Sequence, residues 1–390
     1  MKRYAHIIGW GKYAPENVLT NDDLSRMVDT SDEWIRTRTG IQTRHIVGEG
    51  ETTATMGLRA AQAALEVANV TPDQIDLIIV ATASPDYPTP ATACLVQDAL
   101  GATRAGAFDL AAGCSGFVYG LSVASGLIEA GTYDTILVIG AETISHAIDW
   151  SDRGTCVLFG DGAGAVVLQA SESPGGVLAS VMGADGSGAE LLYVPAGGCR
   201  RPTSADTVAQ GLHFLRMEGR PVFRFAVNIM PRASRLVCER AGLSLDDIEL
   251  FIPHQANERI IQASARALKI PAERMFTNLE RYGNTSAASI PIALCEAVEA
   301  GLIRRGDHLV LVGFGAGLTW AAAAVQWSMP WPVPTRPWWR TTLRWLYYRW
   351  ASLRSWTLRT LRRMDTQIRK PFSHDAENGD QQPHKEDSTK

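Results

Sequence analysis

An internal repeat constrains the fold of this chain more than any other feature. In the first half, the apolar run IDLIIV at 75–80 is followed by a helix-like stretch and then by TILVIGAET at 135–143. In the second half, IELFIP at 248–253 precedes another helix-like stretch and HLVLVGFGAG at 308–317. The separation in sequence between the first pair of runs equals that between the second pair. Matching elements at a constant offset indicate a duplicated α/β unit.

Two such units would place their matching helix starts near a pseudo-twofold axis. Cys114 and Asn284 both precede apolar, helix-like stretches and are separated by nearly the same offset, so we expect them to lie close together. We divide this part of the chain into halves at 1–180 and 181–330, joined by a Gly-, Arg- and Pro-rich stretch at Gly183–Arg220. Short β-branched and apolar runs predict buried strands at Ile75–Val80, Thr135–Gly140, Ile248–Ile252 and His308–Gly313, and Ala107–Leu110 also has the pattern of a strand.

Composition limits the class of protein. With 35 glycines and 20% charged residues, the chain fits a soluble α/β enzyme better than a disordered or fibrous protein. The apolar stretch near the N-terminus is too short for a secretory signal, and no apolar run is long enough to cross a bilayer, so we expect a cytoplasmic protein. The six cysteines are scattered without a CxxC pair, which indicates reduced thiols and no metal site.

Cys114 is a candidate nucleophile. It lies in AAGCSGF, after the strand predicted at Ala107–Leu110 and at the start of an apolar helix. Small neighbours allow a tight turn and close approach of a substrate. The positive end of a helix dipole favours the thiolate, which is the reactive form of cysteine. The alternative is a buried cysteine that only packs at a helix start.

His254 and Asn284 extend this hypothesis. His254 follows the strand at Ile248–Ile252, and functional sites collect at the carboxyl ends of strands in α/β sheets. Asn284 begins the next helix-like stretch. Taken singly, each is as well explained as a helix cap. A cysteine nucleophile with a neutral histidine and an amide as hydrogen-bond donors makes a coherent catalytic site.

Six motifs from Tyr4 to about Trp327 carry a resemblance to a known family. They are, in order, SDEWIRTRTGI (31–41), AAGCSGF (111–117), DRGTCVLFGDGAGA (152–165), PHQANERI (253–260), YGNTSAAS (282–289) and FGAGLTW (314–320). Together they resemble β-ketoacyl-acyl-carrier-protein synthase III, an acyltransferase that starts fatty acid biosynthesis. The resemblance implies a thiolase-like α/β fold, with two duplicated units forming a five-layered αβαβα core. This chain has Cys, His and Asn at the site, whereas the resemblance to elongating condensing enzymes would require Cys, His and His.

The resemblance assigns roles to individual residues. It implies that Cys114 accepts the acyl group and that His254 and Asn284 support decarboxylation. It also implies an oxyanion hole formed by the backbone N–H groups of Cys114 and Ala316. The family usually has Gly-Gly-Gly where this chain has Gly315-Ala316-Gly317, a change that a main-chain site tolerates if the backbone angles allow it.

The resemblance also implies how two substrates bind. Trp34 and Arg153 match the pair that holds the adenine of coenzyme A, and Arg38 matches a nucleotide contact. An indole and a guanidinium both stack on flat bases, although Trp34 also fits a core aromatic.

For the second substrate, malonyl-acyl-carrier protein, the resemblance implies a docking patch on a helix expected at Gln255–Leu268, with Gln255, Arg259 and Arg266 as contacts. A solvated charged face explains Arg266 equally well. Carrier proteins are acidic, which is why a basic patch is required.

Other implied partners and cofactors are few. The resemblance implies a homodimer, in which the loop near Tyr87–Ala91 of the partner shapes the pocket for the starter acyl chain. It implies no cofactor, since coenzyme A enters as a thioester substrate. GDGAGA at 160–165 lacks the spacing of a nucleotide-binding loop, and we assign it no ligand. Nothing in the sequence indicates binding of a metal or a nucleic acid.

Residues 331–390 lie outside the resemblance and differ in charge from the rest. Residues 1–330 carry a net charge of −10, whereas 331–390 carry +6. After a Pro-rich linker, the pattern predicts a basic, Trp-rich amphipathic helix within 331–370 and a polar, disordered tail at 371–390. Its apolar stripe would hold Trp339, Leu343, Leu346, Trp350, Leu353, Leu361, Met364 and Ile368, largely opposite Arg340, Arg344, Arg354, Arg359 and Arg362.

Three roles remain open for this helix, at 338–370. It would lie peripherally on an anionic membrane, bind an acidic partner, or pack against the enzyme body.

Two other functions also remain open from the sequence. One is a specialised condensing enzyme of secondary metabolism. The other is a catalytically silent scaffold subunit, which would normally have lost the nucleophile that this chain retains at Cys114.

Overall fold

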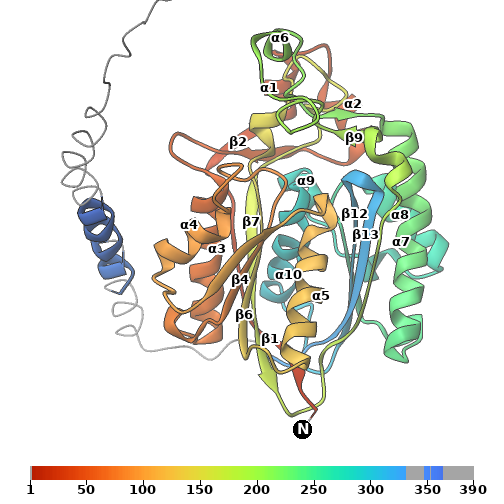
Figure 1. Ribbon diagram of the computed structural model, residues 1–390. Coiled ribbons are helices and arrows are strands. Elements are labelled where there is room, and N and C mark those ends of the chain that lie inside the picture. Colours follow the sequence, from red (N-terminus) through yellow and green to blue (C-terminus); the bar gives the residue numbers. More distant parts are fainter. Residues whose placement is uncertain (1, 331–346, 352, 363–390) are drawn as a thin grey trace, which may run out of the picture.

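Two β-sheets lie at the centre of this computed structural model, which describes residues 2–330, 347–351 and 353–362 (Figure 1). The first sheet contains, in spatial order, β1 (Tyr4–Tyr13), β7 (Gly162–Ser171), β6 (Thr135–Glu142), β4 (Leu77–Ala81) and β5 (Gly106–Leu110). The second contains β11 (Leu250–Pro253), β12 (His308–Gly315), β13 (Thr319–Gln326) and β8 (Gly176–Gly183). β4 runs parallel to β5 and β6, and β11 runs parallel to β12.

Helices form the other three layers, as Figure 1 shows. Between the sheets lie α5 (Gly116–Glu129) and α10 (Ser289–Glu299). The outer face of the first sheet is covered by α3 (Thr53–Ala68) and α4 (Thr92–Leu100), and that of the second by α7 (Gly219–Ala241) and α8 (Glu258–Leu268). Three buried apolar clusters join the layers: one lies outside each sheet, and one surrounds the central helices and contacts both sheets. The five-layered αβαβα core predicted from the sequence is confirmed.

The spacing of the elements confirms the duplication. β11, α10 and β12 follow β4, α5 and β6 at one constant offset, because their first residues pair as 77 with 250, 116 with 289 and 135 with 308. The short 3₁₀ helices η2 (Gly113–Ser115) and η7 (Ser286–Ala288) keep the same offset and lie in contact. The repeat partner of Cys114 is therefore Ala287, and Asn284 shortly precedes it.

Local sequence explains how the central helices fit between the sheets. α5 buries apolar residues around most of its circumference, as expected of a helix inside a core. α10 approaches the first sheet closely because glycines face it. A Cβ on Gly140 would lie 2.3 Å from the carbonyl oxygen of Ala287, and one on Gly164 would lie 2.7 Å from Pro291 Cβ.

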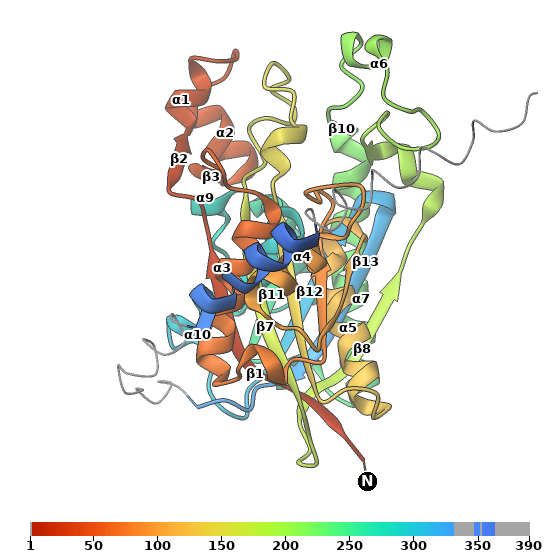
Figure 2. The same ribbon diagram turned by 60° about the vertical axis from the view of Figure 1, so that its left-hand side comes forward.

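Smaller elements gather at one end of the molecule (Figures 1 and 2). They include β2 (Asn17–Thr20), α1 (Asn21–Ser25), α2 (Asp32–Thr39), β3 (Thr43–Ile46), β9 (Leu192–Tyr193), α6 (Ala205–Ala209), β10 (Arg216–Met217) and α9 (Leu279–Tyr282). Three of them, β9, α6 and β10, lie within the predicted join at Gly183–Arg220.

Two predicted boundaries differ from the structure. β8 belongs to the second sheet, so the halves meet between Ser171 and Gly176 rather than at residue 180. α8 begins at Glu258 rather than Gln255, because the Asn257 side chain caps it by accepting the N–H of Arg259 at 2.9 Å. Within the described residues, none of the helices has the length and apolarity needed to cross a bilayer.

Candidate active site

Cys114 lies in η2, between the end of β5 and the start of α5. The chain turns sharply here because Gly113 has φ +53°, a conformation that favours glycine. Gly315, from the second half, packs so closely against this turn that a Cβ on it would lie 2.4 Å from Cys114 N. The two halves of the molecule therefore meet at the candidate nucleophile.

The environment of Cys114 keeps its thiol protonated. The side chain is 7% exposed, and burial raises the pKa of Cys114 to about 12. A hydrogen bond with Ser286 lowers this pKa, whereas the charge of the nearby Glu142 raises it. The sequence predicted a thiolate favoured by the helix start. Burial acts against that thiolate, because it disfavours the charged form.

A loop at 315–317 brings a second backbone N–H beside the turn at Cys114. A Cβ on Gly113 would lie 2.7 Å from Ala316 N, so the two backbone segments are in direct contact. The left-handed backbone angle in this loop falls at Gly317, with φ +74°, and not at Ala316. The alanine at position 316 therefore causes no backbone strain here.

Thr319 holds the loop and the turn together. Its Oγ1 lies 2.8 Å from Ala112 O and 3.1 Å from Ala316 O. The Ser115 hydroxyl lies 2.9 Å from Thr319 Oγ1. These contacts fix the positions of the two N–H groups that the sequence nominated as an oxyanion hole.

His254 follows β11 directly and is 1% exposed. Burial lowers the pKa of His254 to about 3, so the imidazole is neutral near pH 7. Its Nδ1 lies 2.6 Å from the Ser289 hydroxyl, and its ring meets Phe314 edge-on with centroids 5.3 Å apart. When Ser289 donates to Nδ1, the ring proton is on Nε2, and Nε2–H is a hydrogen-bond donor.

Asn284 lies between α9 and η7, in a segment bound to the first half. Its backbone N–H donates to Leu158 O at 2.8 Å, and its carbonyl accepts the N–H of Gly160 at 3.1 Å. The side-chain oxygen accepts the N–H of Ser286 at 2.9 Å. This bond orients the amide so that its NH₂ group is the end available to a ligand.

Cys114, His254 and Asn284 all line one cavity of about 210 Å³. The cavity passes between the two halves, and most of its remaining lining is apolar. That lining includes Leu158, Phe159, Leu192, Met217, Val222, Phe223, Ile260 and Phe314. The three residues that the sequence nominated separately are thus brought together by the structure.

Glu142 is a buried carboxyl group close to this site that sequence reasoning missed. It is fully buried, and burial raises its pKa, although hydrogen bonds from Ser84, Ser286 and two backbone N–H groups oppose the rise. Its Oε1 accepts the Ser286 hydroxyl at 2.8 Å and the Ala287 N–H at 3.3 Å, and its Oε2 accepts the Ser84 hydroxyl at 2.6 Å. The sequence did contain a signal for this buried group, because Glu142 is an acidic residue at the end of the apolar run TILVIGAE.

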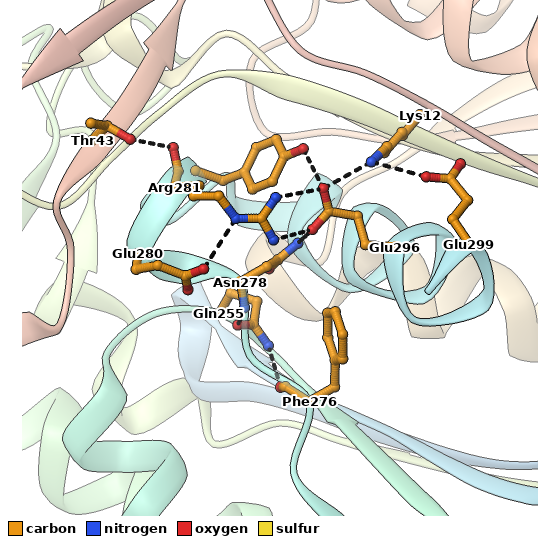
Figure 3. A network of polar contacts seen from close by, with 10 residues as sticks. Lys12, Thr43, Gln255, Phe276, Asn278, Glu280, Arg281, Glu296 and Glu299 are labelled. Carbon is orange, nitrogen blue, oxygen red and sulfur yellow. Dashed lines mark hydrogen bonds and ion pairs between the residues drawn. The ribbon is translucent and has the colours of Figure 1, made fainter. Parts of the chain in front are cut away.

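Figure 3 shows a second buried carboxylate, Glu296, which supports the segment around Asn284. It accepts hydrogen bonds from Lys12 at 2.8 Å, Tyr282 at 2.6 Å, Asn278 at 3.0 Å and both terminal nitrogens of Arg281. Burial acts to raise the pKa of Glu296, but these donors together lower it to about 2. The ionised group therefore ties β1, α9 and α10 together.

Gln255 belongs to this buried support and not to a surface. It is 1% exposed, accepts the N–H of Asn278 at 3.1 Å, and donates to Phe276 O at 3.2 Å (Figure 3). It also donates to Pro253 O at 2.7 Å. The prediction that its side chain contacts a carrier protein does not fit this position. Its place next to His254 indicates that it holds the end of β11 in position.

Trp34 and the two arginines predicted beside it lie together. Trp34 is half-buried on α2, with Arg38 Cζ 4.8 Å and Arg153 Cζ 5.0 Å from its ring centroid. Arg153 is also held by Asp29, whose carbonyl oxygen accepts its Nη1–H at 2.6 Å. The three side chains form an exposed stack of flat groups, which is the geometry that suits a nucleotide base.

A hollow lined by arginines adjoins the catalytic cavity. It is lined by Arg38, Arg220, Arg224 and Arg259, and it shares Gly219 and Phe223 with the cavity around Cys114. Arg220 and Arg224 were missed in the sequence, although their spacing of four at the start of a helix was a signal. Arg266 is exposed on α8 but does not line the hollow.

Two family models match separate parts of the chain. The one described as 3-Oxoacyl-[acyl-carrier-protein (ACP)] synthase III matches residues 108–186. Its C-terminal counterpart matches residues 238–327. A protein of Roseiflexus sp. (strain RS-1) with the name beta-ketoacyl-[acyl-carrier-protein] synthase III is 54% identical over 328 residues, which is 84% of this chain and 100% of the relative. This chain belongs to the β-ketoacyl-[acyl-carrier-protein] synthase III family.

Further similarities agree with this membership. A family member from Symbiobacterium thermophilum is 56% identical over 322 residues, 83% of this chain and 98% of the relative. The crystal structure of 3-oxoacyl-[acyl-carrier-protein] synthase III from Aquifex aeolicus VF5 matches with a TM-score of 0.77 at 50% identity, covering 83% of this chain and all of that one. The six motifs found in the sequence therefore belong to a β-ketoacyl-[acyl-carrier-protein] synthase III.

Proposed function

We propose that this chain is an initiating β-ketoacyl-acyl-carrier-protein synthase of fatty acid biosynthesis. It condenses an acyl-CoA starter with malonyl-acyl-carrier protein, with loss of carbon dioxide and through an acyl-Cys114 intermediate. The observation that carries the proposal is the single cavity shared by Cys114, His254 and Asn284. Family membership supports the same activity. A silent scaffold would not need the complete set of three.

The first half-reaction transfers the acyl group to Cys114. The cysteine sulfur attacks the thioester carbonyl, and the N–H groups of Cys114 and Ala316 stabilise the negatively charged oxygen. The carbon–sulfur bond to coenzyme A then breaks. The thiol proton lost by Cys114 leaves on the sulfur of coenzyme A, so this step has no net change in protons.

The second half-reaction forms the carbon–carbon bond. Malonyl-carrier protein loses carbon dioxide, and the bonding electrons form an enolate whose oxygen accepts hydrogen bonds from His254 Nε2–H and the Asn284 amide. Each donor contributes about 3 kcal/mol in comparable sites. The enolate carbon attacks acyl-Cys114, and the carbon–sulfur bond to Cys114 breaks. The sulfur takes up a proton from water, and a β-ketoacyl-carrier protein is released.

The exposed side chains around the cavity suit the binding of coenzyme A and of the acyl carrier protein. The adenine of coenzyme A would enter between Trp34 and Arg153, which must first separate because Arg153 Cζ lies 5.0 Å from the Trp34 ring centroid, and Arg38 would contact the nucleotide. The acidic surface of the carrier protein would face Arg259 and its neighbours Arg220 and Arg224, with Arg266 at the edge. No resident cofactor or metal takes part in this scheme, and the CoA thioester is a substrate. Among the described residues, no cluster of three or more His, Cys, Asp or Glu is arranged to hold a metal ion.

Arg259→Glu tests the docking surface. We expect a KM for malonyl-carrier protein raised at least about tenfold and an acyl-CoA KM changed less than about twofold, because opposite charge steers association. Arg305→Glu is the matched control, since Arg305 is exposed on the loop before β12. Unchanged KM in Arg259→Glu would remove Arg259 from the docking surface.

We also propose a cytoplasmic homodimer that associates through β5. This strand is at the edge of the first sheet, and its Phe108 is exposed. An uncovered edge strand pairs readily with a second copy of itself. Tyr87 is exposed nearby in sequence, on the loop expected to shape the starter pocket of the partner. Phe108→Arg should convert the dimer to a monomer in light scattering, and an unchanged mass would exclude β5 as the interface.

Reconstitution tests the proposed activity. The purified protein is offered a panel of acyl-CoAs with malonyl-carrier protein, and the carrier products are weighed by mass spectrometry. We expect β-ketoacyl products that require both substrates, and none from Cys114→Ala. The acyl-CoAs accepted also distinguish a fatty-acid starter enzyme from a specialised synthase. Release of free acid without a carbon–carbon bond would contradict the proposal.

A further inference from the structure

The described part of the chain beyond residue 330 is a helix with two unlike faces. Residues 347–351 and 353–362 are helical. In Figures 1 and 2, this dark-blue helix lies beside α4, on the side of the molecule formed by the first half.

The inner face of this helix is attached to the C-terminal end of α4. Ala351 and Ser355 are buried there, and a Cβ on Gly101 would lie 2.7 Å from Ala351 Cβ. The Tyr347 hydroxyl donates to Gly101 O at 3.1 Å. The Ser355 hydroxyl donates to the Asp98 carboxylate, and Arg359 lies 3.5 Å from the same carboxylate. Small and polar residues therefore fix the helix to the enzyme body.

The outer face carries the large apolar residues. Trp350, Leu353, Trp356 and Leu361 are each between 59% and 61% exposed. Residues 347–362 contain four arginines and no acidic residue. Arg349 and Arg362 are exposed as well. Trp350, Leu353 and Leu361 belong to the predicted apolar stripe and point away from the enzyme body. The other predicted members of the stripe (Trp339, Leu343, Leu346, Met364 and Ile368) lie outside the described residues.

We propose that this outer face docks the enzyme on an anionic phospholipid bilayer. Tryptophan and leucine side chains enter the region between headgroups and acyl chains, and neighbouring arginines attract anionic headgroups. Packing on the body and contact with a membrane were alternatives in the sequence. In the structure they use opposite faces of one helix and are compatible.

Other occupants fit this face less well. A second copy of the same face would bring two sets of arginines together, and like charges oppose that contact. An acidic protein would match the charge but would leave four large apolar side chains without a specific partner. The bilayer satisfies both features at once. The inference does not depend on the proposed condensation, because none of these residues lines the catalytic cavity.

The test uses the full-length protein and flotation with vesicles of phosphatidylcholine alone or mixed equally with phosphatidylglycerol. We expect binding to the mixed vesicles, weakened by salt, and at least about tenfold weaker in the double variant Trp350→Ser, Trp356→Ser. Val208→Ser with Leu302→Ser is the matched control, because it removes two similarly exposed apolar residues from the body. Arg349→Gln should weaken binding about fivefold.

The double variant Trp350→Ser, Trp356→Ser should keep its condensation activity on soluble substrates. A loss of vesicle binding can therefore be distinguished from a loss of the proposed function. Absence of binding to the mixed vesicles would overturn the proposal. Equal binding by the double variant, or equal binding to uncharged vesicles, would overturn it too. A fall in oligomer mass in the double variant without vesicle binding would assign the face to a second copy of the chain instead.

Discussion

The substitution Ser289→Ala removes one hydroxyl group from the candidate site and changes little else. The Ser289 hydroxyl is the hydrogen-bond partner of His254 Nδ1, at 2.6 Å, inside a region where both residues are buried. Without it, the neutral imidazole loses the bond that holds its proton on Nε2 and leaves Nδ1 buried without this partner. A lost partner of this kind costs about 1–3 kcal/mol. At about 1.4 kcal/mol for each tenfold change, the condensation rate should fall about 5- to 150-fold.

The assay separates the two half-reactions of Ser289→Ala. Acylation of Cys114 by acyl-CoA is followed by intact mass, and condensation is followed by carbon dioxide release from malonyl-carrier protein. We expect acylation to change less than about twofold, because His254 acts in the second half-reaction. Ser289→Thr, which keeps a hydroxyl, should restore part of the rate.

Ser264→Ala is the matched control for this prediction, because Ser264 is also buried but bonds the carbonyl of Ile260 within α8. It should leave both half-reactions unchanged. Normal condensation in Ser289→Ala, or an equal loss in both half-reactions, would refute the assignment of Ser289 as the residue that positions His254.

Two further predictions follow from buried ionisable groups. Because the folded-state pKa of Glu296 lies at about 2, below its ordinary 4.5, its stabilisation is present above pH 4.5 and is lost as pH falls towards 2. Glu296→Gln should therefore lower the free energy of unfolding by about 2 kcal/mol at pH 7, with allowance for solvent screening, and by less at pH 3; an equal loss in urea titrations at both pH values would contradict this. For Cys114, the raised pKa predicts an iodoacetamide alkylation rate that increases about tenfold per pH unit from pH 6 to 9, measured on the Cys114 peptide, whereas a plateau near pH 7 would indicate a resting thiolate.

The fold was predictable because the repeat is visible in one dimension. The apolar runs at 75–80 and 248–253 contain most of β4 and all of β11, and a constant offset needs no knowledge of contacts. The same repeat brought Cys114 and Asn284 together, since their helix starts meet between the sheets. Local sequence was sufficient to predict those site residues that directly follow a strand or begin a helix, such as His254.

The features that could not be predicted from the sequence depend on burial and on contacts between distant parts of the chain. Gln255 was expected on a docking surface, but its amide is bonded to Asn278 inside the protein, far beyond the reach of a local pattern. The protonated state of Cys114 depends on how completely the second half covers it. The two faces of the tail helix depend on its contacts with Gly101 and Asp98 in the first half of the chain, which no pattern within the tail contains.

The central claim is that Cys114 carries the acyl group while His254 serves only the condensation. The most direct test incubates His254→Ala with an acyl-CoA and measures the intact mass before and after addition of malonyl-carrier protein. The account predicts an acyl adduct that maps to Cys114 and persists without formation of a β-ketoacyl product. An adduct at another residue, or β-ketoacyl product formed at the rate of the unmodified protein, would contradict it.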